Sequence, residues 1–338
     1  MAGAVFVSGA SGYLAGFTIR QLIADGWAVH GSLRSLSRER ELRAILGEDN
    51  ERLRFFAADL AHDAGWSEAM AGCHYALHIA SPIGVTQPKT EDEMIVPARD
   101  GSLRVLKAAR DAGVKRVVMT SSAAAIQYGH GRGDRLFTEA DWTNIDGPHM
   151  NAYNKSKTIA ERAARDWMAS EGGAMEFVSL NPTAIIGPVI SADYAPSIEI
   201  IKRMLDGSLP RCPDWGFGIV DVRDLAALHI KAMTEPELNG ERFIASSRFY
   251  KLIEIAGILK ANLGDNGRKV PVGILPSWIV RLAALAMPEL RSIAGELGRV
   301  CAVDSSHVKR KLGWETRPIE ETLLDCAHSL IAQGIVRL

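Results

Sequence analysis

Strand-like and helix-like patterns alternate along the first half of this chain, and this alternation constrains its fold more than any other feature. Strands and helices that alternate at this spacing form parallel βαβ units, with helices on both faces of one sheet. We therefore predict an α/β fold with a doubly wound parallel sheet of about seven strands. The predicted strands are 4–8, 27–33, 53–57, 75–79, 116–120 and 176–180, and the predicted helices between them are 14–25, 38–46, 66–71, 97–112 and 151–170.

The alternation loosens after Pro182, where further prolines break the chain into shorter pieces. A strand at 218–222, a helix at 223–233 and a strand at 242–245 are nevertheless expected to return to the first domain. Ligands of open α/β sheets bind beyond the carboxyl ends of the strands, so the remaining segments should form a lobe that covers that crevice. The expected division is a main domain of residues 1–182 and 218–246 and a smaller, mainly helical substrate lobe of residues 183–217 and 247–338.

The chain carries 39 Lys and Arg residues against 40 Asp and Glu residues, which gives a formal net charge of -1. Without a long basic run, this balance is not that of a nucleic-acid-binding protein. The four cysteines lie far apart, with no C-x-x-C pair and no histidine spacing that would complete a zinc site. We therefore expect free thiols, no metal and, because thiols stay reduced there, a cytoplasmic location.

No segment of the chain has the pattern expected of a membrane anchor. The N-terminus lacks a basic segment ahead of an apolar run, so we do not expect a signal peptide. The most apolar later stretch, 274–287, is interrupted by Arg281 and bracketed by Pro276 and Pro288. It is shorter than the roughly 18 uncharged residues that a membrane span requires. We therefore expect a core or interface helix there and no membrane partner.

The first strand runs into a glycine turn of the pattern G-x-x-G-x-x-A, which opens the first helix. Gly9 permits the tight turn, and Gly12 lets the backbone approach a pyrophosphate. The N–H groups at the helix start would face the phosphates. A plain strand-to-helix loop is the alternative, but the position inside a βαβ unit favours dinucleotide binding. The contacts expected from this turn are Gly9, Ser11, Gly12, Tyr13 and Leu14.

The end of the second strand indicates which dinucleotide is bound. A site that prefers NAD usually carries an acidic residue there for the ribose diol, and this chain has Ser32 instead. Arg34, Ser35 and Arg38 suit a 2′-phosphate, so we predict NADP(H) as the cofactor. The alternative is that these residues form the solvent-exposed, basic start of a helix and bind no phosphate. Just after the third strand, Asp59 and Leu60 are placed to meet the adenine, although Asp59 would serve equally as a turn residue or helix cap.

Three polar residues are expected to converge on one carbonyl group. Tyr153 and Lys157 lie four apart on one predicted helix and therefore share a face, and Ser122 follows the strand at 116–120. A ketone accepts hydride only as its oxygen takes a proton, which Tyr153 can donate once Lys157 lowers its pKa from about 10 toward neutral. Ser122 would hold the substrate oxygen. The alternative is an exposed Tyr and Lys on a solvated helix.

These motifs together resemble the extended short-chain dehydrogenases/reductases. The similarity is greatest to the branch of dihydroflavonol reductases, cinnamoyl-CoA reductases and microbial aldehyde or ketone reductases. It implies a Rossmann-type sheet and a catalytic triad of Ser122, Tyr153 and Lys157. It also implies that Ala80, Ser81, Pro82, Pro182 and Thr183 flank the nicotinamide ribose. Thr120, Tyr153 and Lys157 are further expected cofactor contacts.

The substrate site is less clearly marked. Gln127 occupies the position where the resembling flavonoid enzymes place a polar substrate contact. Tyr194, Met204 and Phe217 would line an apolar pocket, with ordinary core packing as the alternative. The glycine-rich segment 129–133 is interpreted either as a lid over the crevice or as a polar surface loop.

We therefore expect an NADP(H)-dependent reductase of a small or medium, largely apolar aldehyde or ketone. One alternative is a nucleotide-sugar epimerase or dehydratase with the same triad, for which Lys202, Arg203 and Arg211 would hold the diphosphate. Another is a non-catalytic dinucleotide-sensing protein, although such relatives typically lose the Tyr and Lys. A homodimer through the helices at 97–112 and 151–170 is also expected, with apolar positions such as Val105 and Ala109 at the interface.

Overall fold

The computed structural model describes residues 3–47, 51–82, 88–131, 133–287 and 290–337. Its centre is a seven-stranded sheet in the order β11-β7-β5-β4-β1-β2-β3, in which each strand pair is parallel. The predicted doubly wound parallel sheet is confirmed. The strands are β1 (Ala4–Val7), β2 (Ala28–Leu33), β3 (Leu53–Ala57), β4 (Cys73–His78), β5 (Arg116–Thr120), β7 (Glu176–Pro182) and β11 (Arg242–Ala245).

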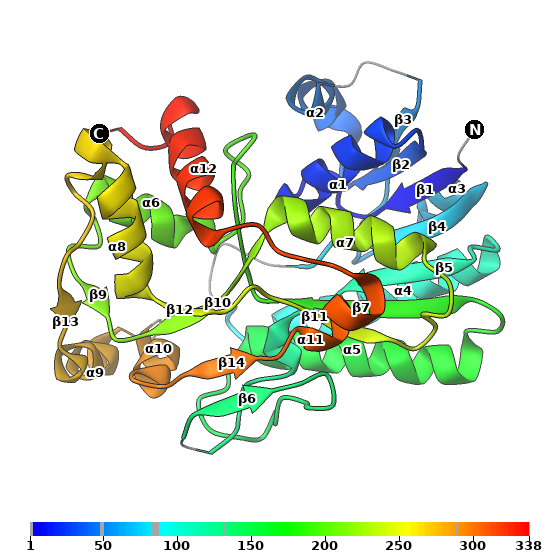
Figure 1. Ribbon diagram of the computed structural model, residues 1–338. Helices are drawn as coiled ribbons and strands as arrows, with labels where there is room; N and C mark the ends of the chain where they lie inside the picture. The colour runs from blue at the N-terminus through cyan, green and yellow to red at the C-terminus, as the bar shows by residue number, and fades with distance from the viewer. Residues whose placement is uncertain (1–2, 48–50, 83–87, 132, 288–289, 338) are drawn as a thin grey trace.

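Helices cover both faces of this sheet (Figure 1). Successive residues of a strand point to opposite faces, so Val5 and Val7 join the buried cluster under α1 and α7, whereas Phe6 joins the cluster under α3, α4 and α5. These helices are α1 (Tyr13–Ala24), α2 (Glu39–Leu46), α3 (Trp66–Met70), α4 (Asp92–Asp111), α5 (Ala152–Glu171) and α7 (Val222–Thr234).

Helix α4 differs from the prediction in two ways. It begins at Asp92 rather than Pro97, because Pro97 is accommodated inside the helix and two acidic residues, Asp92 and Glu93, favour the helix start at their position. Val105 and Ala109, expected at a dimer interface, are fully buried in the core of their own chain. The stated reason for a dimer through this helix is therefore wrong.

The chain reverses direction across the sheet between β1 and β4. From β1 it builds outward through β2 to β3, and it then crosses back to β4 and continues through β5, β7 and β11. Ligands of open α/β sheets bind beyond the carboxyl ends of the strands at such a switch point. The glycine turn after β1 and the residues after β4 and β5 meet at this edge of the sheet.

One strand expected in the main sheet lies elsewhere. The predicted strand 218–222 forms as β10 (Gly216–Asp221), but it pairs with β8 (Ala184–Ile186) and β12 (Phe249–Lys251) in a separate three-stranded sheet. The position beside β7 is taken by β11, so β10 has no partner there. Helix α7 and strand β11 do return to the main sheet as expected. The division of the chain into the two predicted domains stays a prediction.

The remaining elements lie outside the seven-stranded sheet. The pair β6 (Arg135–Phe137) and β14 (Cys301–Val303) brings the C-terminal part of the chain against the segment that follows β5. The other elements are η1 (Leu36–Arg38), η2 (Ala123–Ala125), α6 (Ile198–Asp206), β9 (Cys212–Pro213), α8 (Leu252–Asn262), η3 (Gly264–Gly267), β13 (Ile274–Leu275), α9 (Ser277–Ala286), α10 (Arg291–Glu296), α11 (Ser306–Leu312) and α12 (Ile319–Ala332).

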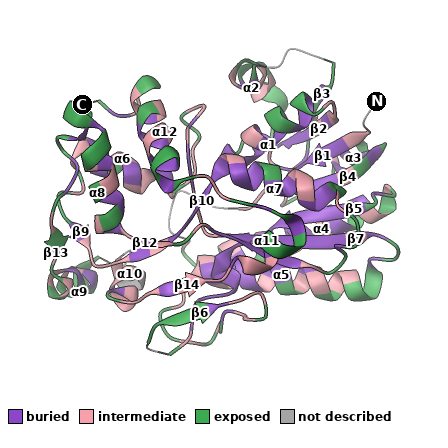
Figure 2. Cartoon of the chain, in the orientation of Figure 1, coloured by how far each residue is buried: buried purple, intermediate pink, exposed green. Residues whose placement is uncertain are grey.

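The apolar stretch around α9 is not a core helix. Its side chains Trp278, Leu282 and Leu285 are 66%, 61% and 75% exposed, and α9 lies at the periphery of the molecule (Figure 2). The interpretation as a core helix is wrong, whereas the interpretation as an interface helix stays a prediction. Within the described residues, no helix is both long and apolar enough to cross a membrane.

Candidate active site

Tyr153, Lys157 and Ser122 come together at the start of α5. The side chain of Asn151 caps this helix by accepting a hydrogen bond from the backbone N–H of Asn154 at 2.8 Å. This places Tyr153 in the first turn, and its hydroxyl donates to Ser122 Oγ at 3.4 Å. Ser122 lies just beyond β5 and is itself fixed, because its Oγ also accepts from Ala124 N at 3.1 Å. Lys157 follows one turn later and is buried.

Burial controls the protonation of both residues on the helix. It raises the pKa of the Tyr153 hydroxyl, and the hydrogen bond with Ser122 opposes this rise only in part. The expected fall of the Tyr153 pKa toward neutral is therefore not seen in the structure, since desolvation outweighs the neighbouring groups. Burial lowers the pKa of Lys157 to about 8, against the opposing influence of the Glu161 carboxylate.

The glycine turn packs directly against the residues after β4. Gly9 has a φ of 66°, and a Cβ at this position would lie 2.9 Å from the Cβ of Ala80. Its N–H donates to Ser32 Oγ at 3.0 Å, so Ser32, which replaces the acidic residue of an NAD site, also anchors the turn. Only glycine fits there. The close backbone and the helix start at Gly12 fit the diphosphate of a dinucleotide.

The side chains of Tyr13 and Leu14 point into the core rather than toward this turn. The Tyr13 hydroxyl is buried with no hydrogen-bond partner in the described part of the chain, and burial raises its pKa. Any contact of Tyr13 or Leu14 with a cofactor would therefore use backbone N–H groups. Ser11 is partly exposed at the surface of the turn.

The three residues predicted to hold a 2′-phosphate differ in their surroundings. Arg34 is exposed and has no hydrogen bond or ion pair among the residues that the structure describes. Ser35 caps η1 through a bond from Ser37 N. Arg38 is bound by two carboxylates, those of Glu41 at 2.8 Å and Asp193 at 2.5 Å. Of the two arginines, only Arg34 is free to meet a phosphate without first giving up a partner.

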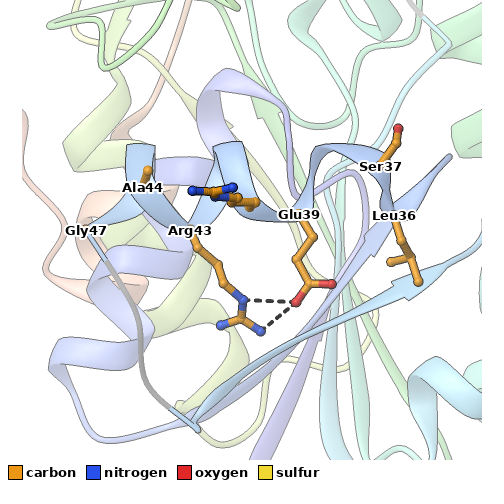
Figure 3. A pocket seen from close by; sticks show the side chains of 7 residues that line it. Leu36, Ser37, Glu39, Arg43, Ala44 and Gly47 are labelled. Atoms are coloured by element: carbon orange, nitrogen blue, oxygen red, sulfur yellow. Dashed lines mark hydrogen bonds and ion pairs between the residues drawn. The ribbon is translucent and has the colours of Figure 1, made fainter.

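A surface cavity of about 770 Å³ lies beside the same segment, next to α2. In it the Glu39 carboxylate accepts hydrogen bonds from Arg43 (Figure 3). Ser122, Tyr153 and Lys157 do not line this cavity. Its lining residues are Leu36, Ser37, Glu39, Arg40, Arg43, Ala44 and Gly47.

The side chains of other predicted cofactor residues mostly have partners within the chain. Asp59 Oδ1 accepts from Ala61 N at 3.0 Å, which fits a turn residue. The Thr120 hydroxyl is bound to His229 at 2.7 Å, and the Thr183 hydroxyl donates to Ser246 Oγ at 3.1 Å. The Thr120 hydroxyl keeps acceptor lone pairs beside this bond, so Thr120 can still accept a hydrogen bond from a cofactor. Leu60, another member of the predicted set, packs against Gly101 of α4. The remaining members are Ala80, Ser81 and Pro82, which follow β4, and Pro182, which ends β7.

The four residues predicted to contact substrate differ in burial. Gln127 is buried, and its Oε1 has no partner among the described residues. Tyr194 and Phe217 are partly buried, and the Tyr194 hydroxyl donates to Glu199 at 3.0 Å. Met204 is fully buried because α6 turns it inward with Ile201. We therefore remove Met204 from the predicted substrate contacts.

A second cavity, of about 970 Å³, lies where the segment after β5 meets α9 and α10. His130 and Gly131 line it from the glycine-rich segment 129–133, of which residue 132 lies outside the described residues. Gly131 O accepts from Arg299 Nη2 at 3.0 Å, which joins this segment to the residues before β14. Whether the segment acts as a lid stays a prediction.

Comparisons with known proteins identify the family of this chain. The sequence model of the NAD dependent epimerase/dehydratase family matches residues 5–245. The chain belongs to this family. Tetraketide alpha-pyrone reductase 1 of Arabidopsis thaliana is 30% identical over 98% of this chain and 96% of its own length. Cinnamoyl-CoA reductase CAD2 of Medicago truncatula is 32% identical over 76% of this chain and 79% of its own.

A solved structure gives a similar result. The yeast methylglyoxal/isovaleraldehyde reductase Gre2, in complex with NADPH, superposes with a TM-score of 0.82 at 25% identity, covering 98% of this chain and 100% of that one. The resemblance to extended short-chain dehydrogenases/reductases is thereby confirmed.

The sequence analysis missed one buried carboxylate beside the candidate site of this member of the NAD dependent epimerase/dehydratase family. Glu161 lies one turn beyond Lys157 on α5 and is fully buried with Arg242 of β11. A signal for it was present, since Glu161 shares the helix face of Tyr153 and Lys157, and Arg242 interrupts an otherwise apolar strand. An acidic residue on the buried face of a helix and a basic residue on a buried strand together indicate an ion pair.

No cluster of three or more His, Cys, Asp or Glu side chains that could hold a metal is found in the described ranges. The four cysteines are buried free thiols.

Proposed function

We propose that this chain is an NADP(H)-dependent reductase that transfers hydride between the nicotinamide and the carbonyl of a small or medium, largely apolar aldehyde or ketone. In reverse it would oxidise the alcohol. The observation that carries the proposal is the 3.4 Å contact between the Tyr153 hydroxyl and Ser122 Oγ, with Lys157 buried one turn further along the helix.

In this proposal each of the three side chains has a separate role. Ser122 Oγ donates a hydrogen bond to the carbonyl oxygen and stabilises its developing negative charge. The Tyr153 hydroxyl donates the proton that the oxygen needs as it becomes an alcohol. The Lys157 ammonium favours the ionised tyrosine that remains and binds the ribose hydroxyls of the cofactor. The bound NADPH supplies the hydride.

The preference for NADP(H) has two supports. Ser32 provides no carboxylate to repel a 2′-phosphate, and Arg34, which has no partner among the described residues, follows at the end of β2. The yeast reductase with a similar fold was solved with NADPH. The relatives named above are reductases by their descriptions, which supports the same class of reaction here.

A scan of NADPH consumption over aldehydes, diketones, ketoesters and aryl ketones tests the proposal. We expect turnover with at least one apolar carbonyl compound and loss of that turnover in Tyr153→Phe. Turnover of a nucleotide sugar without net consumption of cofactor would instead establish an epimerase or dehydratase. Binding of NADPH without turnover of any compound would favour a sensing protein.

We also infer a cytoplasmic location and a homodimer. The buried free thiols support the first inference. For the second, the exposed apolar side chains of α9 are a better candidate interface than α4, whose apolar residues are buried. Light scattering that finds only monomer over the working concentration range would contradict the dimer.

A further inference from the structure

Glu161 is the most enclosed charged group near the proposed active site. Its side chain is 0% exposed, and each of its two oxygens accepts several hydrogen bonds. Oε1 accepts from Arg242 Nε at 2.7 Å and from Ser179 Oγ at 2.9 Å. Oε2 accepts from Ser121 Oγ at 2.5 Å and from Asn181 Nδ2 at 2.7 Å. A carboxylate with this many donors stays ionised despite burial.

Two of these donors belong to the residues that hold Ser122. Ser121 is its neighbour in the chain, and Asn181 of β7 donates a second hydrogen bond to Ser122 O at 3.0 Å. One carboxylate thus binds the hydroxyl before the catalytic serine and the amide that fixes its carbonyl. Movement of Glu161 would therefore move Ser122.

Arg242, the partner of Glu161, also binds the segment after Ser122. It donates to Ala125 O at 3.3 Å, to Glu139 O at 2.9 Å and to Asp141 O at 2.6 Å. Its guanidinium also lies over the Trp142 ring, 3.8 Å from the centroid. The ion pair of Arg242 with Glu161 thus adds a link between α5 and the loop beyond Ser122.

The charged groups that contact Glu161 come from two elements, α5 and β11. Arg165 lies on α5 and Arg242 on β11, while β7 and the segment after β5 contribute only uncharged donors to Glu161. Burial opposes ionisation of Glu161, but the two arginines outweigh it and lower the pKa of the carboxyl. On the β4 side of Lys157, His78 is neutral at physiological pH, because burial lowers its pKa to about 3. Glu161 is the anion that favours the protonated Lys157.

We propose that Glu161 is a positioning residue of the active site, which holds Ser122 through Ser121 and Asn181 and provides the counter-charge for Lys157 one helical turn away. This proposal rests on the proposed reductase function, but part of its test does not. It assigns a role in the reaction to a side chain that touches neither the substrate nor the cofactor.

The chain contains a second ion pair with a buried arginine, and its carboxylate, Glu176, is 29% exposed and serves as a control. Arg116 is 2% exposed, its Nε donates to Glu176 Oε2 at 2.6 Å, and its Nη1 donates to the carbonyl oxygens of Ala232 and Met233. This pair lies at the amino end of β5, whereas Ser122 follows its carboxyl end. Loss of the Glu176 carboxylate therefore shows what removal of a partner from a buried arginine does to kcat away from the proposed site.

The experiment compares Glu161→Gln with Glu176→Gln. We expect Glu161→Gln to lower kcat by at least about tenfold and to move the basic limb of the pH profile to lower pH, because Lys157 loses its counter-charge. Glu176→Gln should leave kcat within about twofold of the wild type and the basic limb of the pH profile in place. If Glu161→Gln behaves like Glu176→Gln, the proposal is wrong.

A second readout does not need turnover. Nitrogen NMR of isotope-labelled lysine side chains, with the Lys157 signal assigned by Lys157→Met, follows the titration of its Nζ. The midpoint should fall in Glu161→Gln and stay unchanged in Glu176→Gln. If the wild type reduces no carbonyl compound, the proposed function fails, but this titration still decides the role of Glu161 as counter-charge.

Asn181→Ala is a second variant that tests the positioning of Ser122 if Glu161→Gln does not fold. It removes the amide that joins Glu161 to Ser122 without removing a charge. We expect kcat to fall by about fivefold or more while the basic limb of the pH profile stays in place. An unchanged kcat in a folded Asn181→Ala protein would overturn the positioning of Ser122.

Discussion

Arg38 forms an ion pair with Asp193, 155 positions later in the chain, with 2.5 Å between Nη2 and Oδ2. The contact joins the segment after β2, where a 2′-phosphate is expected, to the segment between β8 and α6. Both side chains are about half exposed, at 42% and 48%. A 2′-phosphate that approaches Arg38 therefore competes with a carboxylate that is already bound.

Asp193→Asn should strengthen NADPH binding. An exposed ion pair contributes roughly 0.2–1 kcal/mol, so release of Arg38 should lower the Kd for NADPH by about 1.5- to 5-fold. The Kd for NADH, which lacks the 2′-phosphate, should stay unchanged. Fluorescence titration at low ionic strength measures both, because salt screens the effect. Equal changes for the two cofactors would contradict the assignment.

Arg34→Ala should have the opposite and larger effect. Arg34 has no partner among the described residues, so its whole charge is available to the 2′-phosphate. A charge-assisted hydrogen bond contributes about 1.5–3 kcal/mol, and its loss should raise the KM for NADPH by about tenfold or more. Arg40→Ala, a change of an exposed arginine on α2, is the matched control and should have little effect. Equal losses with NADPH and NADH in Arg34→Ala would rule out recognition of the phosphate.

Carbonyl reduction should weaken as the pH rises through about 8. Burial lowers the pKa of Lys157 to about 8, so the ammonium is present below this pH and is lost above it. Since the proposed mechanism needs the charged lysine, kcat/KM should fall by up to about tenfold for each further pH unit. His78 stays neutral across this range and adds no acid limb. A profile that stays flat to about pH 10 would contradict the role of Lys157.

The sequence predicted those parts of the fold and the site that depend on local patterns. The seven strands of the main sheet and most of its helices follow from hydrophobic periodicity, and the joint position of Tyr153 and Lys157 follows from their spacing of four. The membership of β10 in the smaller sheet does not, because β7 accepts β11 at its free edge and nothing in the residues of β10 indicates this choice.

Contacts between distant segments were the features that sequence reasoning missed. Arg38 and Asp193 are paired across two parts of the chain, and Glu161 accepts hydrogen bonds from β7, from β11 and from Ser121 just after β5. The upward shift of the Tyr153 pKa likewise depends on burial, which the spacing of residues along one helix does not reveal.

The central claim is that the Tyr153 hydroxyl, 3.4 Å from Ser122 Oγ, donates the proton to the carbonyl oxygen. The most direct test is the rate of NADPH consumption by Tyr153→Phe with the best carbonyl substrate of the wild type, measured together with the Kd for NADPH. The account predicts a fall in kcat of about a hundredfold or more, with the Kd within about threefold of the wild type, because the hydroxyl acts on the proton and not on the dinucleotide. Turnover by Tyr153→Phe near that of the wild type would contradict it.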